Sequence, residues 1–202
     1  LAIQDMQRRH GSIDGQSAIL ALGRLSTGAL TAHSDLDLVV VFQAGTNAQS
    51  TGDRALGSQA YFTRLTQTFV NWLSRPTAEG SLYEVDMRLR PDGDKGGIAV
   101  GIQRFTEYYN KDAWTWEKLA LVKARIVTDP AQAKAVVTAL TEAIHEITRD
   151  PINLPIVSKA VLDMRRRLRY AYGSASALQL RKLPGGMAEL DLLVQGLRLV
   201  HA

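Results

Sequence analysis

The first 128 residues alternate between stretches with the periodicity of a strand and stretches with that of a helix. An apolar run between glycines, or one rich in β-branched residues, is typical of a buried strand. Apolar side chains at every fourth position predict a helix, and strict apolar–polar alternation predicts a half-buried strand. The apolar run between glycines covers residues 17–25, and the run rich in β-branched residues covers 36–42. The four-residue spacing covers 56–73, and the strict alternation covers 82–90. Further elements are expected over 2–10 (helix), 98–100 (short return strand), 102–110 and 112–124 (helices).

The last part of the chain, residues 129–202, carries helical periodicity only. Helices are predicted over 131–148, 155–171 and 187–201, and two prolines, Pro151 and Pro155, separate the first from the second. The third helix reaches the end of the chain, so we interpret this part as a truncated helical region. The sequence therefore predicts two domains, residues 1–128 and residues 129–202.

Composition narrows the class of protein. Of the 202 residues, 46% are apolar and 22% are charged, as in an ordinary globular protein with a buried core. There is no apolar run of the about 18 residues that cross a membrane, and no signal-peptide pattern at the start. The absence of cysteine excludes disulfides, zinc–thiolate sites and thiol catalysis, and agrees with a cytoplasmic location. The net charge of +4 permits anionic ligands such as nucleotides without requiring a nucleic-acid partner.

Two aspartates at the start of the second predicted strand are the first candidates for chemistry. Asp35 and Asp37 lie two positions apart, so a strand places both on one face, about 7 Å from each other. Carboxylates at that spacing repel each other unless a cation lies between them, and Mg²⁺ prefers oxygen ligands of this kind. A solvated pair of aspartates at a strand end explains the same pattern, and the motif alone leaves both interpretations open.

The alternating strand over 82–90 adds a third carboxylate. The period of two predicts that Glu84, Asp86, Arg88 and Arg90 share its polar face. A third carboxylate beside the first pair would complete a two-metal site, and the neighbouring arginines would hold triphosphate oxygens. The alternative is cross-strand charge pairing on an exposed face of the sheet.

A turn of small residues, Ser26-Thr27-Gly28, precedes the aspartate pair. Small residues allow backbone amides to approach a phosphate closely, so this turn is a candidate phosphate cradle. Most turns of this composition bind nothing, and the pattern by itself is not specific.

Several motifs together resemble one family. Gly23–Leu25 followed by Ser34–Leu38 is similar to the strand–turn–strand of polymerase-β-like nucleotidyltransferases. Four more specific segments read LYEVDMRLRP, AWTWE, ALVKAR and PGGMAELD, at residues 82–91, 113–117, 120–125 and 184–191. In this order and spacing they resemble glutamine synthetase adenylyltransferase over residues 15–202. The double Trp and the LYEVD wording resemble its C-terminal, adenylylating half.

The resemblance implies an α+β fold in which helices flank a small mixed sheet, followed by part of a helical bundle. It implies an Mg²⁺-dependent transfer of AMP from ATP to a tyrosine hydroxyl of glutamine synthetase, which regulates nitrogen assimilation. It assigns metal binding and catalysis to Asp35, Asp37 and Asp86, and it assigns the role of general base to Asp86. It assigns nucleotide binding to Ser26, Thr27, Gly28, Ser34, Arg88 and Arg90. Further candidate site residues are Arg24, Glu84, Glu117, Glu189 and Asp191. The resemblance also implies that a PII-type signalling protein and glutamine regulate the full-length enzyme.

The chain also departs from the pattern of the family. Arg24 stands where the family usually has Lys, and Ser26-Thr27 replaces a usual Gly-Gly pair. Glu189 and Asp191 reverse the usual order of Asp and Glu. Three alternatives therefore stay open: the reverse, phosphorolytic removal of AMP; a degenerate domain that binds a nucleotide or a partner; and nucleotide transfer to RNA ends. The modest charge disfavours the last, because RNA binding depends on many basic contacts.

Overall fold

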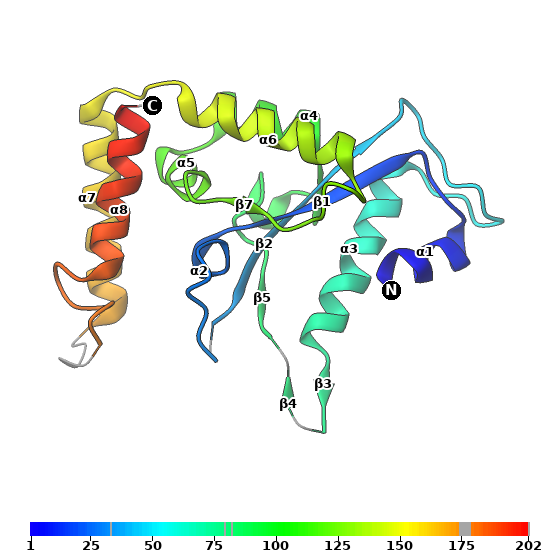
Figure 1. Ribbon diagram of the computed structural model, residues 1–202, viewed down its shortest axis with the longest axis horizontal. Helices are drawn as coiled ribbons and strands as arrows, with labels where there is room; N and C mark the ends of the chain where they lie inside the picture. Colours follow the sequence, from blue (N-terminus) through cyan, green and yellow to red (C-terminus); the bar gives the residue numbers. More distant parts are fainter. Residues whose placement is uncertain (33, 79, 82, 174–178, 202) are drawn as a thin grey trace. The chain divides into compact units, whose positions relative to one another are not determined.

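The computed structural model describes residues 1–32, 34–78, 80–81, 83–173 and 179–201 (Figure 1). The chain divides into two compact units. The first consists of Leu1–Asp112 and Ala124–Ala143, and the second of Ala113–Lys123 and Ile144–Ala202. No helix in the described ranges is long and apolar enough to cross a bilayer.

A small mixed sheet forms the centre of the first unit. Its two long strands, β1 (Gly15–Ala21) and β2 (Leu36–Ala44), pair antiparallel. Two short strands, β5 (Val85–Asp86) and β6 (Ala99–Gly101), pair parallel with β2, and β7 (Arg125–Ile126) pairs antiparallel with β1. β2 therefore lies inside the sheet, and its run of β-branched residues is buried, as its composition predicts.

Helices cover the sheet because each has an apolar stripe to bury. They are α1 (Ala2–His10), α3 (Ser58–Ser74), α4 (Ile102–Glu107) and the part of α6 (Lys134–Arg149) that belongs to this unit, as far as Ala143. Phe42 of β2 stacks on Phe62 of α3, with ring centroids 4.7 Å apart, and Met6 of α1 joins the same cluster. This cluster fixes the face of β2 that bears Phe42 towards α3. Asp37 lies on the opposite face by the alternation of the strand.

Short elements fill the connections of this unit. A four-residue helix, α2 (Gly23–Ser26), follows β1, and a small hairpin joins β3 (Pro76–Thr77) to β4 (Gly80–Ser81). A 3₁₀ turn spans Gly93–Lys95, and a π-helical turn spans Tyr108–Asp112. The hairpin and β7 were not predicted, because two-residue strands have too little sequence to show a period.

Two predicted strands are shorter in the structure. The strand expected over 17–25 ends at Ala21, because the chain turns at Gly23 with a φ of +53° and enters α2. The strand expected over 82–90 is reduced to Val85–Asp86, and Leu82 lies outside the described residues. The expectation that a strand continues through Arg88 and Arg90 was wrong, although the side chain of Arg88 still contacts Asp86. The backbone turns after Asp86, and the N–H of Arg90 donates to the carbonyl oxygen of Met87 at 3.3 Å.

The second unit is helical. It contains α5 (Thr115–Leu121), α7 (Leu154–Tyr172) and α8 (Met187–Val200), and Pro155 stands in the first turn of α7. Gly196 of α8 lets the helix approach α7, since a β-carbon there would lie 2.9 Å from Cγ2 of Val161. The three helices predicted after residue 129 are confirmed within a few residues at each end. The division at residue 128 into a catalytic and a helical domain stays a prediction.

The architecture is thus α+β, with helices around a small mixed sheet and a second, helical unit. This is the fold class that the sequence predicts.

Candidate functional site

Strand pairing brings two of the predicted carboxylates side by side. β5 runs parallel to the start of β2, and Asp37 and Asp86 are register partners. Neighbouring strands lie about 4.8 Å apart, and register partners present their side chains on the same face. Asp35 comes two residues before Asp37, directly ahead of β2. Asp86 lies about 50 positions after this pair in the sequence, and only the sheet brings it to them.

Asp37 is in an unfavourable environment for a negative charge. Burial is the largest cause that raises the pKa of its carboxyl, and the charges of Asp86 and Asp35 raise it further. Arg24 and Arg88 oppose the shift without cancelling it. A divalent cation would relieve both the repulsion and the loss of hydration, so the site favours a positively charged ligand.

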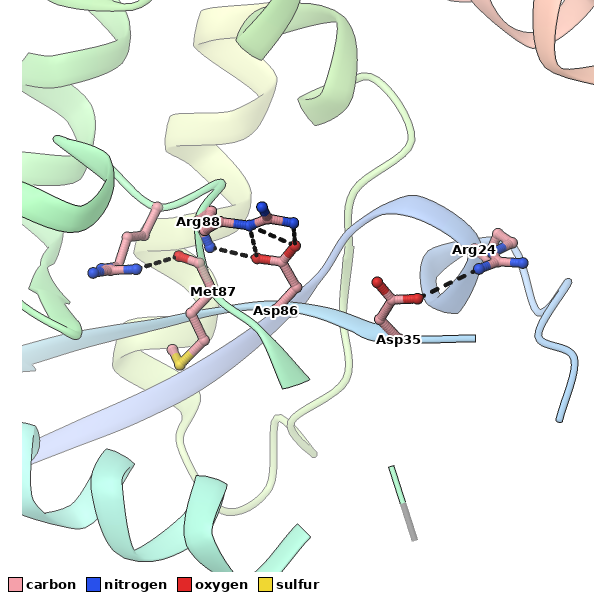
Figure 2. Close-up of polar contacts among 6 residues, drawn as sticks. Arg24, Asp35, Asp86, Met87 and Arg88 are labelled. Carbon is pink, nitrogen blue, oxygen red and sulfur yellow. Dashed lines mark hydrogen bonds and ion pairs between the residues drawn. The ribbon is translucent and has the colours of Figure 1, made fainter. Parts of the chain in front are cut away.

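Asp86 is held by an arginine two residues away (Figure 2). The backbone N–H of Arg88 donates to Oδ1 of Asp86 at 2.8 Å. Its Nε donates to Oδ1 at 3.0 Å and to Oδ2 at 2.9 Å, and its Nη2 donates to Oδ2 at 2.5 Å. The hydrogen bonds from Arg88 are the largest cause that lowers the pKa of Asp86. Both oxygens of this carboxylate are therefore engaged.

Asp35 also faces an arginine. Nη2 of Arg24, on α2, lies 3.6 Å from Oδ1 of Asp35, and both side chains are partly exposed (Figure 2). The forked side chain of Arg24 thus reaches the carboxylate from α2. Two of the three candidate carboxylates are paired with arginines in this structure.

Gly23 is required by the approach of Asp37. Its φ of +53° lies in the left-handed region that side chains other than glycine adopt rarely. A β-carbon on Gly23 would overlap Oδ2 of Asp37. The preceding residue, Leu22, donates its N–H to the carbonyl oxygen of Asp37 at 2.9 Å, which fixes the two segments against each other. The sequence showed this glycine as part of a motif, and the structure supplies its physical reason.

The predicted phosphate turn uses its hydroxyls internally. Ser26 is buried, and its Oγ donates to the carbonyl oxygen of Gly23 at 2.9 Å. Oγ1 of Thr27 donates to the carbonyl oxygen of Arg24 at 3.2 Å. Gly28 has a φ of +70° and open space around the position of a β-carbon. The hydroxyls therefore stabilise the turn itself, and a role of its backbone amides in phosphate binding stays a prediction.

Ser34 is buried at the end of the loop that follows this turn. Its Oγ accepts a hydrogen bond from the backbone N–H of Thr31 at 2.8 Å, and its own N–H donates to the carbonyl oxygen of Thr31 at 2.9 Å. These contacts set the start of β2, directly before Asp35. Ser34 thus positions the acidic segment in this structure.

The hydrogen bonds and ion pair given for Arg90 and Glu84 go to partners other than the three carboxylates. Nη1 of Arg90 donates to the carbonyl oxygen of Met87 at 2.7 Å, and Nη2 lies 3.6 Å from Oδ1 of Asp94. The side chain of Arg90 is only 11% exposed, so it supports the turn from within. The carbonyl oxygen of Glu84 accepts the N–H of Leu36 at 2.8 Å and extends the pairing of β5, while the residue itself is exposed.

One further arginine, which the sequence did not single out, fixes the turn behind Arg88. Nε and Nη2 of Arg104 donate to the two carboxylate oxygens of Asp92 at 3.0 and 2.6 Å. Nη1 of the same side chain donates to Asp112 at 3.1 Å. Asp92 has a φ of +63°, which a non-glycine residue adopts rarely, and the bidentate pair holds it there. No local pattern links residues twelve positions apart, so this contact could be found only in the fold.

Three of the candidate acids belong to the second unit. Glu117 is buried, and its Oε2 accepts the backbone N–H of Trp114 at 2.8 Å, which caps α5. Asp191 lies 3.1 Å from Nζ of Lys123 and 3.8 Å from Nη2 of Arg181. These contacts give both residues a structural role within the second unit. Their role as site residues stays a prediction.

Glu189 is the most strongly bound of these acids. It is buried and accepts hydrogen bonds from Nε of Arg165 at 2.6 Å and from Nε of Arg169 at 2.7 Å. The backbone N–H of Gly185 donates to it at 3.2 Å. The hydrogen bond from Arg169 is the largest cause that lowers the pKa of Glu189 to about 2. Glu189 thus anchors the Gly-Gly turn to α7.

This anchoring predicts an acid-labile second unit. Because the folded pKa of Glu189 lies below its ordinary value, its contribution to stability is present above about pH 4.5 and is lost as the pH falls towards 2. Glu189→Gln is expected to lower Tm by a few degrees at pH 6, and the difference from the native chain should shrink towards pH 2. Thermal unfolding from pH 6 to 2 measures this, with the exposed Glu146→Gln as control. Parallel curves for native chain and Glu189→Gln would contradict the assignment.

The donor set of the first unit fits a magnesium ion in its chemistry. In the part of the chain that the structure describes, no three His, Asp or Glu side chains are grouped closely enough to hold an ion together. Asp35 and Asp86 are paired with arginines instead. All three candidates are carboxylates, however, and two of them are register partners. Binding Mg²⁺ between them would require Arg24 and Arg88 to give up these partners.

Comparison with known proteins places the chain in a family. Residues 2–140 match the family model described as glutamate-ammonia ligase adenylyltransferase. The chain belongs to this family. The matched residues include all the candidate residues of the first unit and Glu117. The match ends before Glu189 and Asp191.

Individual relatives extend the similarity to the whole chain. The chain is 36% identical over 204 residues to the bifunctional glutamine synthetase adenylyltransferase/adenylyl-removing enzyme of Bradyrhizobium sp. (strain BTAi1 / ATCC BAA-1182), covering 100% of the chain and 20% of the relative. It is 38% identical to the enzymes of the same name from Brucella suis biovar 1 (strain 1330) and Agrobacterium fabrum (strain C58 / ATCC 33970), covering 95% and 98% of the chain. These alignments cover 19% and 20% of the two relatives. The chain thus spans about a fifth of the length of these curated relatives.

Proposed function

We propose that this chain transfers AMP from ATP to a tyrosine hydroxyl of glutamine synthetase, with Mg²⁺ held by Asp35, Asp37 and Asp86. The observation that carries the proposal is the register pairing of Asp37 with Asp86 on neighbouring strands, in a chain of the adenylyltransferase family. The raised pKa of Asp37 supports it, since carboxylates that repel one another suit a cation.

The proposed reaction is a single displacement at phosphorus. The tyrosine oxygen forms a bond to the α-phosphorus of ATP, the bond from that phosphorus to the oxygen bridging to the β-phosphate breaks, and pyrophosphate leaves with the electron pair. Bound Mg²⁺ would neutralise the phosphate oxygens and the leaving group. Asp86, once Arg88 has left it, would accept the proton of the tyrosine hydroxyl. The 26–28 turn and Arg88 would hold the β- and γ-phosphates, so most of the catalysis is positioning and charge neutralisation.

Glutamine synthetase is the proposed target because the relatives are named for it. A PII-type signalling protein and glutamine are proposed regulators of the longer enzymes to which such a chain contributes, and the cytoplasm is the proposed location.

A labelling assay tests the direction of the reaction. The chain is mixed with unmodified glutamine synthetase, Mg²⁺ and ATP that is radiolabelled at the α-phosphate. We expect label on glutamine synthetase and one pyrophosphate released for each AMP transferred. Asp37→Asn is expected to abolish labelling, while Asp53→Asn, a change at an exposed aspartate of the same unit, is expected to preserve it.

The second candidate is the reverse, phosphorolytic removal of AMP. The adenylyl-removing activity in the name of the relatives favours it, since a chain of this length spans about a fifth of a bifunctional enzyme. Incubation with adenylylated glutamine synthetase and inorganic phosphate distinguishes the two. Phosphate-dependent release of ADP without labelling in the first assay would replace the proposal by this one. Neither activity would favour a degenerate domain that binds a nucleotide or a partner, which the Ser26-Thr27 turn also motivates.

A further inference from the structure

The contact between Arg88 and Asp86 blocks a proposed metal ligand. Four hydrogen bonds from Arg88 occupy both carboxylate oxygens of Asp86, at distances between 2.5 and 3.0 Å. Within the described part of the chain, every hydrogen bond of this guanidinium goes to Asp86. A metal ion that is to bind Asp86 therefore has to displace the guanidinium from at least one oxygen.

The guanidinium of Arg88 can move away from Asp86 into solvent, because Arg88 lies at the surface. Its side chain is 75% exposed, whereas that of Asp86 is 16% exposed. The released guanidinium is hydrated by the surrounding water, which offsets part of the loss of its contact with Asp86. The turn behind it stays in place, since Arg104 holds Asp92 by a separate bidentate contact. Arg88 can therefore exchange partners without unfolding of its turn.

A triphosphate offers Arg88 an equivalent partner. The planar guanidinium fork that fits two carboxylate oxygens also fits two phosphate oxygens. The carboxylates of Asp35, Asp37 and Asp86 outnumber Arg24 and Arg88, so a nucleotide without a cation is repelled and a cation without a nucleotide competes with the arginines.

We propose that Arg88 exchanges partners during loading of the site: it binds Asp86 in the ligand-free chain and moves to the triphosphate when metal and ATP bind together. It thereby opposes binding of the metal alone and favours joint binding of metal and nucleotide. The coupling is reciprocal, because ATP that draws Arg88 away strengthens metal binding by the same factor by which the metal strengthens ATP binding. The inference rests on the proposed function, and it adds a coupling between metal and nucleotide binding that the proposed function does not require.

Binding measurements on the metal alone test the exchange. Mn²⁺ is titrated into the native chain, Arg88→Gln and Arg88→Lys without nucleotide, and free Mn²⁺ is followed by electron paramagnetic resonance. Arg88→Gln is expected to bind Mn²⁺ about threefold to fivefold more tightly, because the ion no longer competes with the guanidinium for Asp86. Arg88→Lys keeps the charge without the fork and is expected to lie between the two.

The affinity of Arg88→Gln for ATP is expected to change in the opposite direction. With saturating Mg²⁺, calorimetry is expected to show about tenfold weaker ATP binding to Arg88→Gln, because a bidentate phosphate contact is lost. Arg9→Gln is the matched control, since Arg9 is 69% exposed and paired with Asp5 in the same unit. It is expected to match the native chain in both titrations.

The outcomes separate this inference from the proposed function. If the native chain binds Mn²⁺ and labels glutamine synthetase, but Arg88→Gln binds Mn²⁺ no more tightly, the exchange is refuted and the proposed function stands. If Arg88→Gln tightens Mn²⁺ binding without weakening ATP binding, Arg88 blocks the site but does not move to the nucleotide, which also refutes the exchange. If the native chain binds neither ligand, both proposals fail.

Discussion

Replacement of Asp37 by asparagine is expected to abolish AMP transfer while making the ligand-free chain more stable. Loss of a central metal-binding carboxylate should lower the rate by about a thousandfold, which corresponds to about 4 kcal/mol of transition-state stabilisation. The stability effect has the opposite sign. Burial and the neighbouring Asp86 and Asp35 raise the pKa of Asp37 in the folded chain, so its negative charge at neutral pH costs stability that asparagine does not cost.

Two measurements check this pair of effects. Labelling of glutamine synthetase gives the loss of activity, and thermal unfolding without ligand gives the change in Tm, which is expected to increase. Asp53→Asn, at an exposed position of the same unit, controls for removal of one negative charge. A variant that loses both activity and stability would show that Asp37 serves the fold, and the assignment of a functional carboxylate would then be wrong.

Gly23→Ala is expected to damage both the fold and the site. The φ of +53° costs a residue with a β-carbon about 1–2 kcal/mol, and overlap of that carbon with Oδ2 of Asp37 adds to this. We expect a loss of about 2–4 kcal/mol in the free energy of unfolding. Because relief of the overlap requires Asp37 to move, ATP binding in the presence of Mg²⁺ should weaken by at least about tenfold.

Gly80→Ala separates the contact from the backbone strain. Gly80 lies in the same unit with a φ of +107°, and a β-carbon there meets nothing within 4 Å. It is expected to cost about 1 kcal/mol in urea unfolding and to leave ATP binding unchanged. Equal effects of the two substitutions on stability and binding would mean that Gly23 serves its turn alone and not the placement of Asp37.

The helices were the most predictable part of the fold. The apolar stripes of α3, α6, α7 and α8 repeat over many turns, and each helix appears within a few residues of its predicted bounds. β2 was equally clear, since a run of β-branched residues between turn signals has few alternatives. Long periodic segments are predictable because the burial of one face decides their conformation.

The segment after Asp86 shows where periodicity fails. Its alternation of apolar and polar residues is as regular as that of a strand, yet the chain turns after Asp86, where Oδ1 of Asp86 accepts the backbone N–H of Arg88. A local hydrogen bond to the side chain of Asp86 thus replaces the backbone pairing that would continue the strand. The position of Arg90, turned inward onto Met87, follows from the same turn.

In the candidate site, too, some features could be predicted from local sequence patterns and others depend on the fold. The residue types and the family resemblance were enough to name Asp35, Asp37 and Asp86 as candidates from the sequence by itself, because carboxylates at those spacings suit a metal and the surrounding motifs are specific. The sequence also determined the helices and the strand β2, whose patterns are local. The register of Asp37 with Asp86, the approach of Gly23 to Asp37, and the arginine on each of two carboxylates were decided by the tertiary structure. Those contacts join segments through strand pairing and turns, and no one-dimensional pattern records which strands become neighbours or which charge a side chain meets.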